Sequence, residues 1–312
     1  MMKTLVRHPA VLTLAMVLLV WIGAGQALPG FTSWGHLRYL LELAAVIGIA
    51  AAGQTLVVLK GGIDLSTGAV MTVCAILLPL ISPAWDTTGA FGILATLAIA
   101  AGIGALNGLG SSALKVPPII MTLAMATFLQ GLLVIVAGGS AVTVSNLAVT
   151  WLGSARPLGL PAGVWLWASV AVVMLVLMSR SVAGPRILAL GANTRAAVLS
   201  GVRDGRQTVG VFAASGLFSG LAGVLLLGMN RQGYVGIGEP YLLTSIAAVV
   251  LGGTSILGGR GSYAGTIPGA LLLVTASALI TMVNASAGWR NIMFGLLILG
   301  LLLVSGREAA RQ

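Results

Sequence analysis

Few side chains in this sequence have the types and spacing that catalysis requires. Each of its three lysines follows Met or Leu, so there is no Gly-Lys-Ser/Thr loop to hold a nucleotide phosphate. His8 and His36 lack metal-ligand spacing, and Cys74 stands alone in an apolar run, where cysteine behaves as a small hydrophobic side chain. We find no nucleophile elbow and no paired carboxylates. The sequence therefore predicts no catalytic, cofactor-binding or metal site, and the chain by itself is not expected to be an enzyme.

Polar side chains inside apolar runs are the informative exceptions. A charge near the centre of a bilayer costs about 2.5–3.5 kcal/mol, so such residues tend to line a cavity or pair with one another. The side chains of Gln, Asn and Thr also supply donors and acceptors for the hydroxyls of a sugar without a fixed charge. The alternative is that they only hydrogen-bond neighbouring helices. The candidates for a substrate pathway or gate are Gln54, Asp64, Ser66, Asn107, Thr122 and Gln130.

Asp64 lies in a stretch, residues 60–68, where glycines separate two apolar runs. Lys60 and Asp64 have the i,i+4 spacing of a helical ion pair, although Gly61 and Gly62 argue against a continuous helix. A second glycine break, residues 258–262, is expected on the same side. Short spans broken by glycine are typical of transporter cores with internal repeats. The alternative is two tight turns, and because the two stretches match weakly, the repeat is only a hypothesis.

Composition indicates that these residues are set in a membrane. The chain has 312 residues, of which 58% are hydrophobic and 7% charged, whereas soluble domains carry roughly 25% charged residues. Its 44 glycines fit closely packed membrane helices. The net charge is +10, but the basic residues are scattered singly, so we expect no nucleic-acid partner.

Ten apolar runs approach the length of about 20 residues that crosses a bilayer. They are residues 10–27, 37–59, 63–81, 90–114, 119–137, 164–179, 209–229, 241–257, 263–283 and 291–305. We therefore predict an all-α polytopic membrane helix bundle, with about ten transmembrane helices in a single domain over residues 1–312. The first run also resembles a secretory signal ending at residues 25–27, which would leave nine spans in the same orientation.

The distribution of positive charge predicts the orientation. With the N-terminus in the cytoplasm, twelve basic residues fall inside: Lys3, Arg7, Lys60, Lys115, Arg180, Arg186, Arg195, Arg203, Arg206, Arg260, Arg307 and Arg311. Four fall outside: Arg38, Arg156, Arg231 and Arg290. This asymmetry agrees with the positive-inside rule and predicts that both termini are cytoplasmic.

The longest outer loop, residues 138–163, is predicted to be polar and flexible. The longest inner loop, residues 180–206, is predicted to be partly helical and is large enough to contact a partner.

Four stretches in order resemble signatures of the ribose-type permeases of bacterial ATP-binding-cassette sugar importers. They are GGIDLS at residues 61–66 followed by Gly68, KVPPIIMTL at 115–123, GANTRAA at 191–197 with Ser200 and Gly201, and AAVVLGGTS at 247–255 with GGRGS at 258–262. The resemblance covers nearly the whole chain. Thr67 and Pro118 depart from the common pattern, where Val and an aromatic residue are frequent, and these departures leave the substrate open.

The resemblance implies a transmembrane permease subunit that imports a monosaccharide of the ribose, xylose or galactose type across the inner membrane. It implies a second permease chain, identical or a sister, and a periplasmic sugar-binding protein. A separate cytoplasmic ATPase subunit would consume the ATP, so this chain itself would bind no cofactor. The resemblance assigns ATPase coupling to the inner loop, at Gly191, Asn193, Arg195, Ala196, Ala197, Ser200 and Gly201.

Two alternatives stay open at this point. A branched-chain amino-acid permease of the same superfamily would have to hold a zwitterion, and the GGIDLS stretch argues against it. An ion-coupled secondary transporter would need carboxylates within the membrane, for which the only candidates are Asp64 and Glu42.

Overall fold

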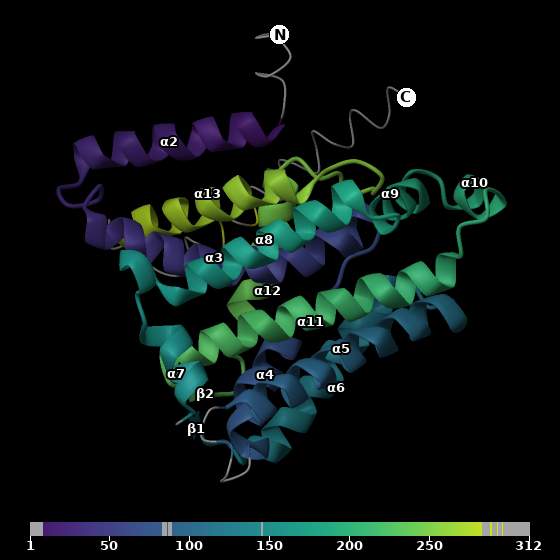
Figure 1. Ribbon diagram of the computed structural model, residues 1–312, viewed down its shortest axis with the longest axis horizontal. Coiled ribbons are helices and arrows are strands. Elements are labelled where there is room, and N and C mark those ends of the chain that lie inside the picture. Colours follow the sequence, from purple (N-terminus) through teal and green to yellow (C-terminus); the bar gives the residue numbers. More distant parts are fainter. Residues whose placement is uncertain are drawn as a thin grey trace.

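The computed structural model describes residues 9–82, 86, 89–144 and 146–282, together with positions 288, 292 and 295. Most of the long helices run between two ends of the molecule (Figure 1). The helices are α2 (Pro9–Ala27), α3 (Trp34–Leu59), α4 (Thr67–Ile81), α5 (Ala90–Ala113), α6 (Pro118–Ala137), α7 (Leu147–Ser154), α8 (Ala162–Arg180), α9 (Ala183–Ala192), α10 (Thr194–Leu199), α11 (Asp204–Asn230), α12 (Glu239–Leu251) and α13 (Tyr263–Met282).

The all-α membrane fold is confirmed. Within the described residues, seven helices are long and apolar enough to cross a membrane, namely α2, α3, α5, α6, α8, α11 and α13. Two shorter apolar helices, α4 and α12, correspond to the runs at 63–81 and 241–257. These helices are shorter than predicted because residues 63–66 and 252–257 belong to the glycine-containing turns. The run at 291–305 lies outside the described residues, positions 292 and 295 apart.

The core is built around α11, which packs against α3, α4, α5 and α7. Small residues allow these backbones to approach closely. Gly104 on α5 faces the carbonyl group of Phe212 on α11, and Gly216 on α11 faces the carbonyl group of Ala100 on α5. Gly108 and Gly220, each four residues further along, face Val209 and Ala100, so both glycine pairs lie at the contact between α5 and α11.

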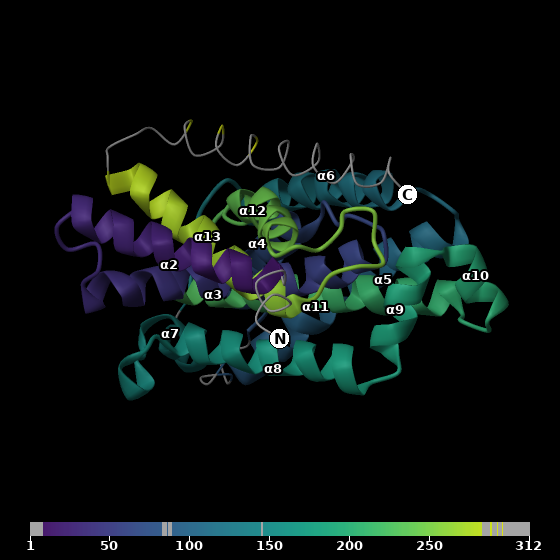
Figure 2. The same cartoon turned by 90° about the horizontal axis from the view of Figure 1, so that it is seen from above.

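The outward faces of the bundle are apolar. Leu19 on α2 is 72% exposed, Leu94 on α5 is 69% exposed and Ile135 on α6 is 80% exposed. Such side chains would be costly in water but belong against lipid tails. Looking down on the bundle, Figure 2 shows α8 along one side and α6 along the opposite side.

The segment predicted as the outer loop, residues 138–163, is structured rather than flexible over its described residues. It contains β1 (Val142–Thr143), α7 and the short 3₁₀ helix η1 (Pro157–Gly159). β1 pairs antiparallel with β2 (Gln232–Gly233), with Val142 opposite Gly233. Val149 on α7 is completely buried, and Gly153 lies against the backbone of Gly228 on α11. Single apolar residues such as Val149 anchor this loop by packing in the core. The loop was predicted to be flexible because polar residues and glycines are interspersed among its apolar ones.

Replacing Gly104 by Ala tests the α5–α11 contact, because a Cβ atom there would collide with the carbonyl oxygen of Phe212. Overpacking of this kind typically costs about 1–3 kcal/mol. We expect Gly104→Ala to lower the thermal unfolding midpoint of the detergent-purified protein. Gly102→Ala on the same helix is the matched control, because nothing lies within 4 Å of its added carbon. Equal midpoints for the two variants would contradict the contact.

Candidate functional site

The turn between α3 and α4 is held by the carboxylate of Asp64, which is 1% exposed. Its Oδ1 accepts hydrogen bonds from the backbone N–H of Ser66 at 2.9 Å and from Ser66 Oγ at 2.6 Å. Its Oδ2 accepts a hydrogen bond from Ser215 Oγ on α11 at 2.7 Å. A buried charge needs hydrogen-bond partners in place of water, and these three donors supply them to the Asp64 carboxylate.

Three further helices attach to the same turn. On α3, the Gln54 amide, in the orientation that satisfies both of its ends, donates to the Asp64 carbonyl oxygen at 3.2 Å and accepts from the Asp64 N–H at 3.3 Å. On α5, Asn107 Nδ2 donates to Ser66 Oγ at 2.9 Å. On α6, Thr122 Oγ1 accepts from the N–H of Leu65 at 3.0 Å. The turn is therefore tied to α3, α5, α6 and α11.

Five of the six candidate pathway residues belong to this buried polar cluster, namely Gln54, Asp64, Ser66, Asn107 and Thr122. The sixth, Gln130, lies elsewhere and donates a hydrogen bond to Glu239 at 3.2 Å. Nearly all hydrogen bonds of the cluster are used within the protein, as expected for groups that join helices. Asn107 Oδ1 is an exception, because this buried atom has no partner among the described residues. That the cluster forms part of a substrate pathway remains a prediction.

The two glycine breaks meet in space, and α9 lies against both of them. The N–H of Gly259, in the turn between α12 and α13, donates to the carbonyl oxygen of Leu59 at the end of α3 at 2.9 Å. Gly258 approaches the backbones of Gly61 and Gly191. We call this meeting of residues 59–61, 191–192 and 258–259 the glycine junction.

Glycine is required at two of these positions for different reasons. A Cβ atom on Gly191 would collide with the carbonyl oxygen of Leu59 and the backbone nitrogen of Gly259. Gly259 has φ +72° and would place a Cβ atom against Ala192, and side chains other than glycine disfavour this left-handed region. Backbone therefore packs directly on backbone at the glycine junction.

The segment assigned to ATPase coupling projects from the same end of the molecule as the glycine junction (Figures 1 and 2). Asn193 separates α9 from α10, and its Oδ1 accepts the backbone N–H of Ala196 at 3.0 Å, which caps α10. Ser200 Oγ donates to the carbonyl oxygen of Ala196 at 3.0 Å, and Gly201 ends the segment with φ +88°. Arg195 is exposed, whereas Ala197 is buried.

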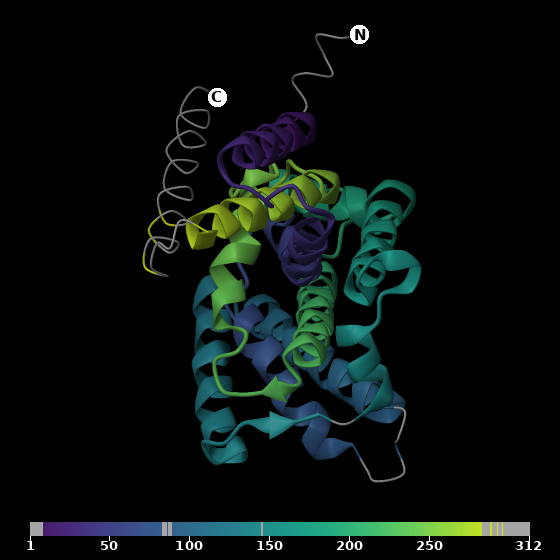
Figure 3. The same cartoon turned by 90° about the vertical axis from the view of Figure 1, so that its left-hand side faces the viewer.

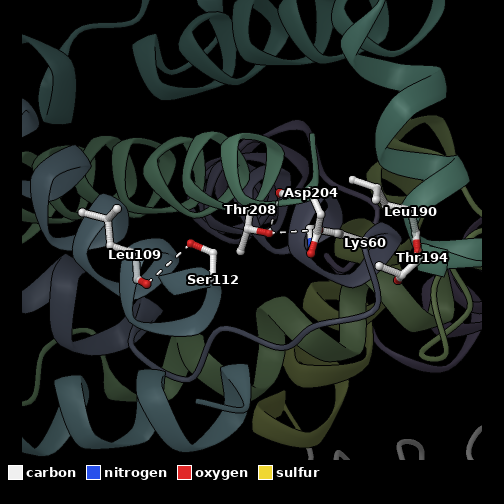
Figure 4. A network of polar contacts seen from close by, with 7 residues as sticks. All are labelled: Lys60, Leu109, Ser112, Leu190, Thr194, Asp204 and Thr208. Carbon is white, nitrogen blue, oxygen red and sulfur yellow. Dashed lines mark hydrogen bonds and ion pairs between the residues drawn. The ribbon is translucent and has the colours of Figure 1, made fainter. Parts of the chain in front are cut away.

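Lys60 forms its ion pair with Asp204 at the start of α11, with 2.9 Å between Nζ and Oδ1. Figure 4 shows these side chains pointing toward each other, with Thr208 donating to the same carboxylate at 3.2 Å. Lys60 and Asp64 do not pair despite their i,i+4 spacing, because α3 ends at Leu59, as Gly61 and Gly62 suggested, and the Asp64 carboxylate faces Ser66 and Ser215. The Lys60–Asp204 pair joins the ends of α3 and α11 beside the glycine junction.

Sequence reasoning missed Glu239, the first residue of α12. It is exposed and lines a cavity of about 510 Å³ between α3, α12 and α13. The available signal was an acidic residue two positions before the apolar run at 241–257, in a chain that has only six acidic residues. Within the part of the chain that the structure describes, no group of three His, Cys, Asp or Glu residues could hold a metal ion.

Comparison with known proteins adds a second kind of evidence to this geometry. Residues 37–302 match the family described as branched-chain amino acid transport system / permease component. The chain is 33% identical to the ribose import permease of Escherichia coli strain K12, over 94% of this chain and 92% of that protein. It is 34% identical to the ribose import permease of Bacillus subtilis strain 168, over 90% and 88% of the two chains.

A third relative carries a different sugar in its name. The fructose import permease of Rhizobium meliloti is 30% identical, over 93% of this chain and 83% of that protein. The matches to these relatives extend along nearly the whole chain, and the family match over residues 37–302 includes the three segments that form the glycine junction.

Gly191→Ala tests the close packing of the glycine junction, because the added carbon must displace the Leu59 carbonyl group. We expect α9 and α10 to loosen, so trypsin should cleave after Arg195 and Arg203 several-fold faster than in the unmodified protein. Gly205→Ala is the matched control, since its nearest neighbour, Ser112, is 3.8 Å away. Indistinguishable cleavage rates for the two variants would show that the junction is not tightly packed.

Proposed function

This chain belongs to the permease family of ATP-binding-cassette sugar importers, and on that premise we propose that it forms the membrane pathway for a monosaccharide. The observation that carries this proposal is the whole-length similarity to import permeases named for ribose and fructose. The family description names branched-chain amino acids, whereas these relatives, at 30% identity or more, are named for sugars. A monosaccharide is therefore the preferred substrate class.

Energy would come from a separate ATPase subunit, because the sequence has no phosphate-binding loop. The surface of α10 supports docking of such a partner. Val198 is 48% exposed and Leu199 is 83% exposed, at the end of the molecule where the positive-inside rule expects cytoplasm. An ATPase subunit docked on α10 would bury these two apolar side chains, and Arg195 on the same helix supplies a charge.

The proposed mechanism is alternating access driven through the glycine junction. Closure of the ATPase dimer moves α9 and α10, and because α9 packs on both glycine breaks, the displacement reaches α3 and the α12–α13 turn together. The permease contributes two conformations that bind the sugar differently, since a ligand shifts an equilibrium only by favouring one state.

The remaining parts of the proposal concern assembly and orientation. Ten spans with both termini in the cytoplasm would place α10 inside and the β1–β2 pair outside, in the bacterial inner membrane. A second permease chain would complete the pathway, and a periplasmic binding protein would deliver the sugar to the outer face. The run at 291–305 would supply the tenth span.

Reconstitution tests the proposed function directly. The permease, its ATPase subunit and its binding protein should together import at least one of radiolabelled ribose, xylose, arabinose, galactose or fructose into proteoliposomes supplied with ATP. We expect no import when the ATPase subunit is left out. Import of leucine but of none of these sugars, or import of sugar without the ATPase, would contradict the proposal.

Asn193 gives a sharper test of coupling. Asn193→Ala removes the cap of α10, and a lost N-cap costs about 1 kcal/mol. We expect sugar uptake to fall several-fold while stimulated ATP hydrolysis persists, measured in parallel on the same proteoliposomes. Asn193→Asp is the matched control, since a carboxylate also caps a helix. Arg195→Ala should uncouple in the same way, and normal transport by both Ala variants would contradict the coupling role.

A further inference from the structure

The cavity between α3, α12 and α13 has a mixed lining. Its volume of about 510 Å³ lies within the range of pockets that hold small ligands. The residues on which the inference rests are Leu43, Ile47, Glu239, Thr244, Val274 and Ser277.

Glu239 lies well inside the predicted hydrocarbon layer, although it is the first residue of a helix. Gln130 Nε2 on α6 donates to Glu239 Oε1 at 3.2 Å. Seven residues, 131–137, separate Gln130 from the end of α6, which is about 10 Å at 1.5 Å per residue. The carboxylate is therefore about 10 Å below the outer end of this span.

The segment before α12 gives an independent measure of this depth. After β2 the chain turns back into the bundle (Figure 3), and the N–H of Gly238 donates to Thr72 Oγ1 on α4 at 3.1 Å. Nine residues, 73–81, lie between Thr72 and the end of α4, or about 14 Å. Non-helical backbone at such a depth is tolerated only where it is buried in protein or lines a water-filled cavity.

An exposed carboxylate at this depth does not belong against lipid. Glu239 is exposed on the single chain, and its hydrogen-bond partner among the described residues is the neutral amide of Gln130. Ionisable residues inside a membrane face the bundle interior or a water-filled pathway, because lipid offers them no partners. An aqueous pathway on this face of α12 would give the carboxylate the partners that lipid cannot.

Besides Tyr241, whose phenol can donate or accept, the polar side chains that line the cavity present acceptors. Thr244 Oγ1 donates its proton to the carbonyl oxygen of Pro240 at 3.0 Å, and Ser277 Oγ donates to that of Leu273 at 2.8 Å. Their oxygen lone pairs, like the carboxylate of Glu239, are then available to accept hydrogen bonds. A neutral polyol supplies many hydroxyl donors. An amino-acid zwitterion could pair its ammonium group with Glu239, but its carboxylate would find no cationic side chain among the lining residues.

We propose that this cavity is a binding site for a neutral polyhydroxylated substrate on the transport pathway, with Glu239 as the residue that selects for hydroxyl donors. Glu239 accepts hydrogen bonds from two sugar hydroxyls, Gln130 holds its carboxylate in place, and Leu43 and Ile47 contact the apolar C–H groups of the sugar. This assignment rests on the proposed function in sugar import.

Uptake by Glu239 variants in the complete reconstituted complex tests the site. The probe is D-ribose, or whichever sugar of the five the unmodified complex imports. We expect Glu239→Leu to reduce uptake by about 10- to 100-fold, the effect of losing a hydrogen-bonding partner that is charged. Glu239→Gln keeps one acceptor oxygen, so its uptake should fall less than that of Glu239→Leu. Stimulation of ATP hydrolysis by the binding protein should stay within twofold, because the glycine junction is untouched.

Glu42→Gln is the matched control, because Glu42 is the neighbour of Leu43 on α3 yet does not line the cavity. Its uptake should stay within twofold of the unmodified complex. Wild-type uptake by Glu239→Leu would overturn the site and leave the proposed function standing, whereas absence of uptake by the unmodified complex would refute the function itself. If Glu239→Leu does not assemble with the ATPase subunit, Glu239→Gln and Thr244→Val decide the question by the same readout.

Water access provides a second readout. In a Cys74→Ala background, Ser277→Cys in the assembled complex should react with a membrane-impermeant thiol reagent added from outside, and the imported sugar should slow that reaction. If Ser277→Cys fails to react in every nucleotide state, lipid or a partner chain covers the cavity, and the inference is overturned.

Discussion

Direct backbone contact at the glycine junction is the constraint on which the rest of this structure depends. The end of α3, the end of α9 and the α12–α13 turn approach so closely that only glycine fits at Gly191 and Gly259. Peptide groups packed in this way have no flexible side chains to absorb a displacement, and close-packed interiors transmit strain. A push on α9 therefore reaches two transmembrane segments that are far apart in sequence.

The polar cluster around Asp64 gives this displacement a defined route. Because Asp64 and Ser66 hydrogen-bond Ser215 on α11 and Asn107 on α5, a shift of the turn after α3 acts on these two helices away from their ends. On its other side, Gly68 at the start of α4 lies against Gly238 and Glu239 at the start of α12. The two short helices thus begin at one place, which connects the polar cluster to the cavity that Glu239 lines.

The sequence predicted the features that depend on composition and on the length of apolar runs. It did not predict the contacts between residues that are far apart in the sequence. Apolar runs predicted nine of the described helices, and the resemblance marked all three segments of the glycine junction. That these segments touch required the fold, because no local pattern relates Gly191 to Leu59. The partner of Lys60 could not be identified for the same reason, since Asp204 lies on another helix. Glu239 was overlooked because a residue at the edge of an apolar run looks like a loop residue until the chain is seen to turn back into the bundle.

The most direct test measures whether the glycine junction moves as one body. Spin labels at positions 199 and 257, in α10 and in the α12–α13 turn, and at position 114 after α5, would sit at exposed leucines in a Cys74→Ala background. Pulsed electron spin resonance on the complete complex would compare distances with and without a trapped ATP analogue. We predict that the 199–257 distance stays constant while the 199–114 distance changes. A 199–257 distance that changes as much as the 199–114 distance would contradict transmission through the junction.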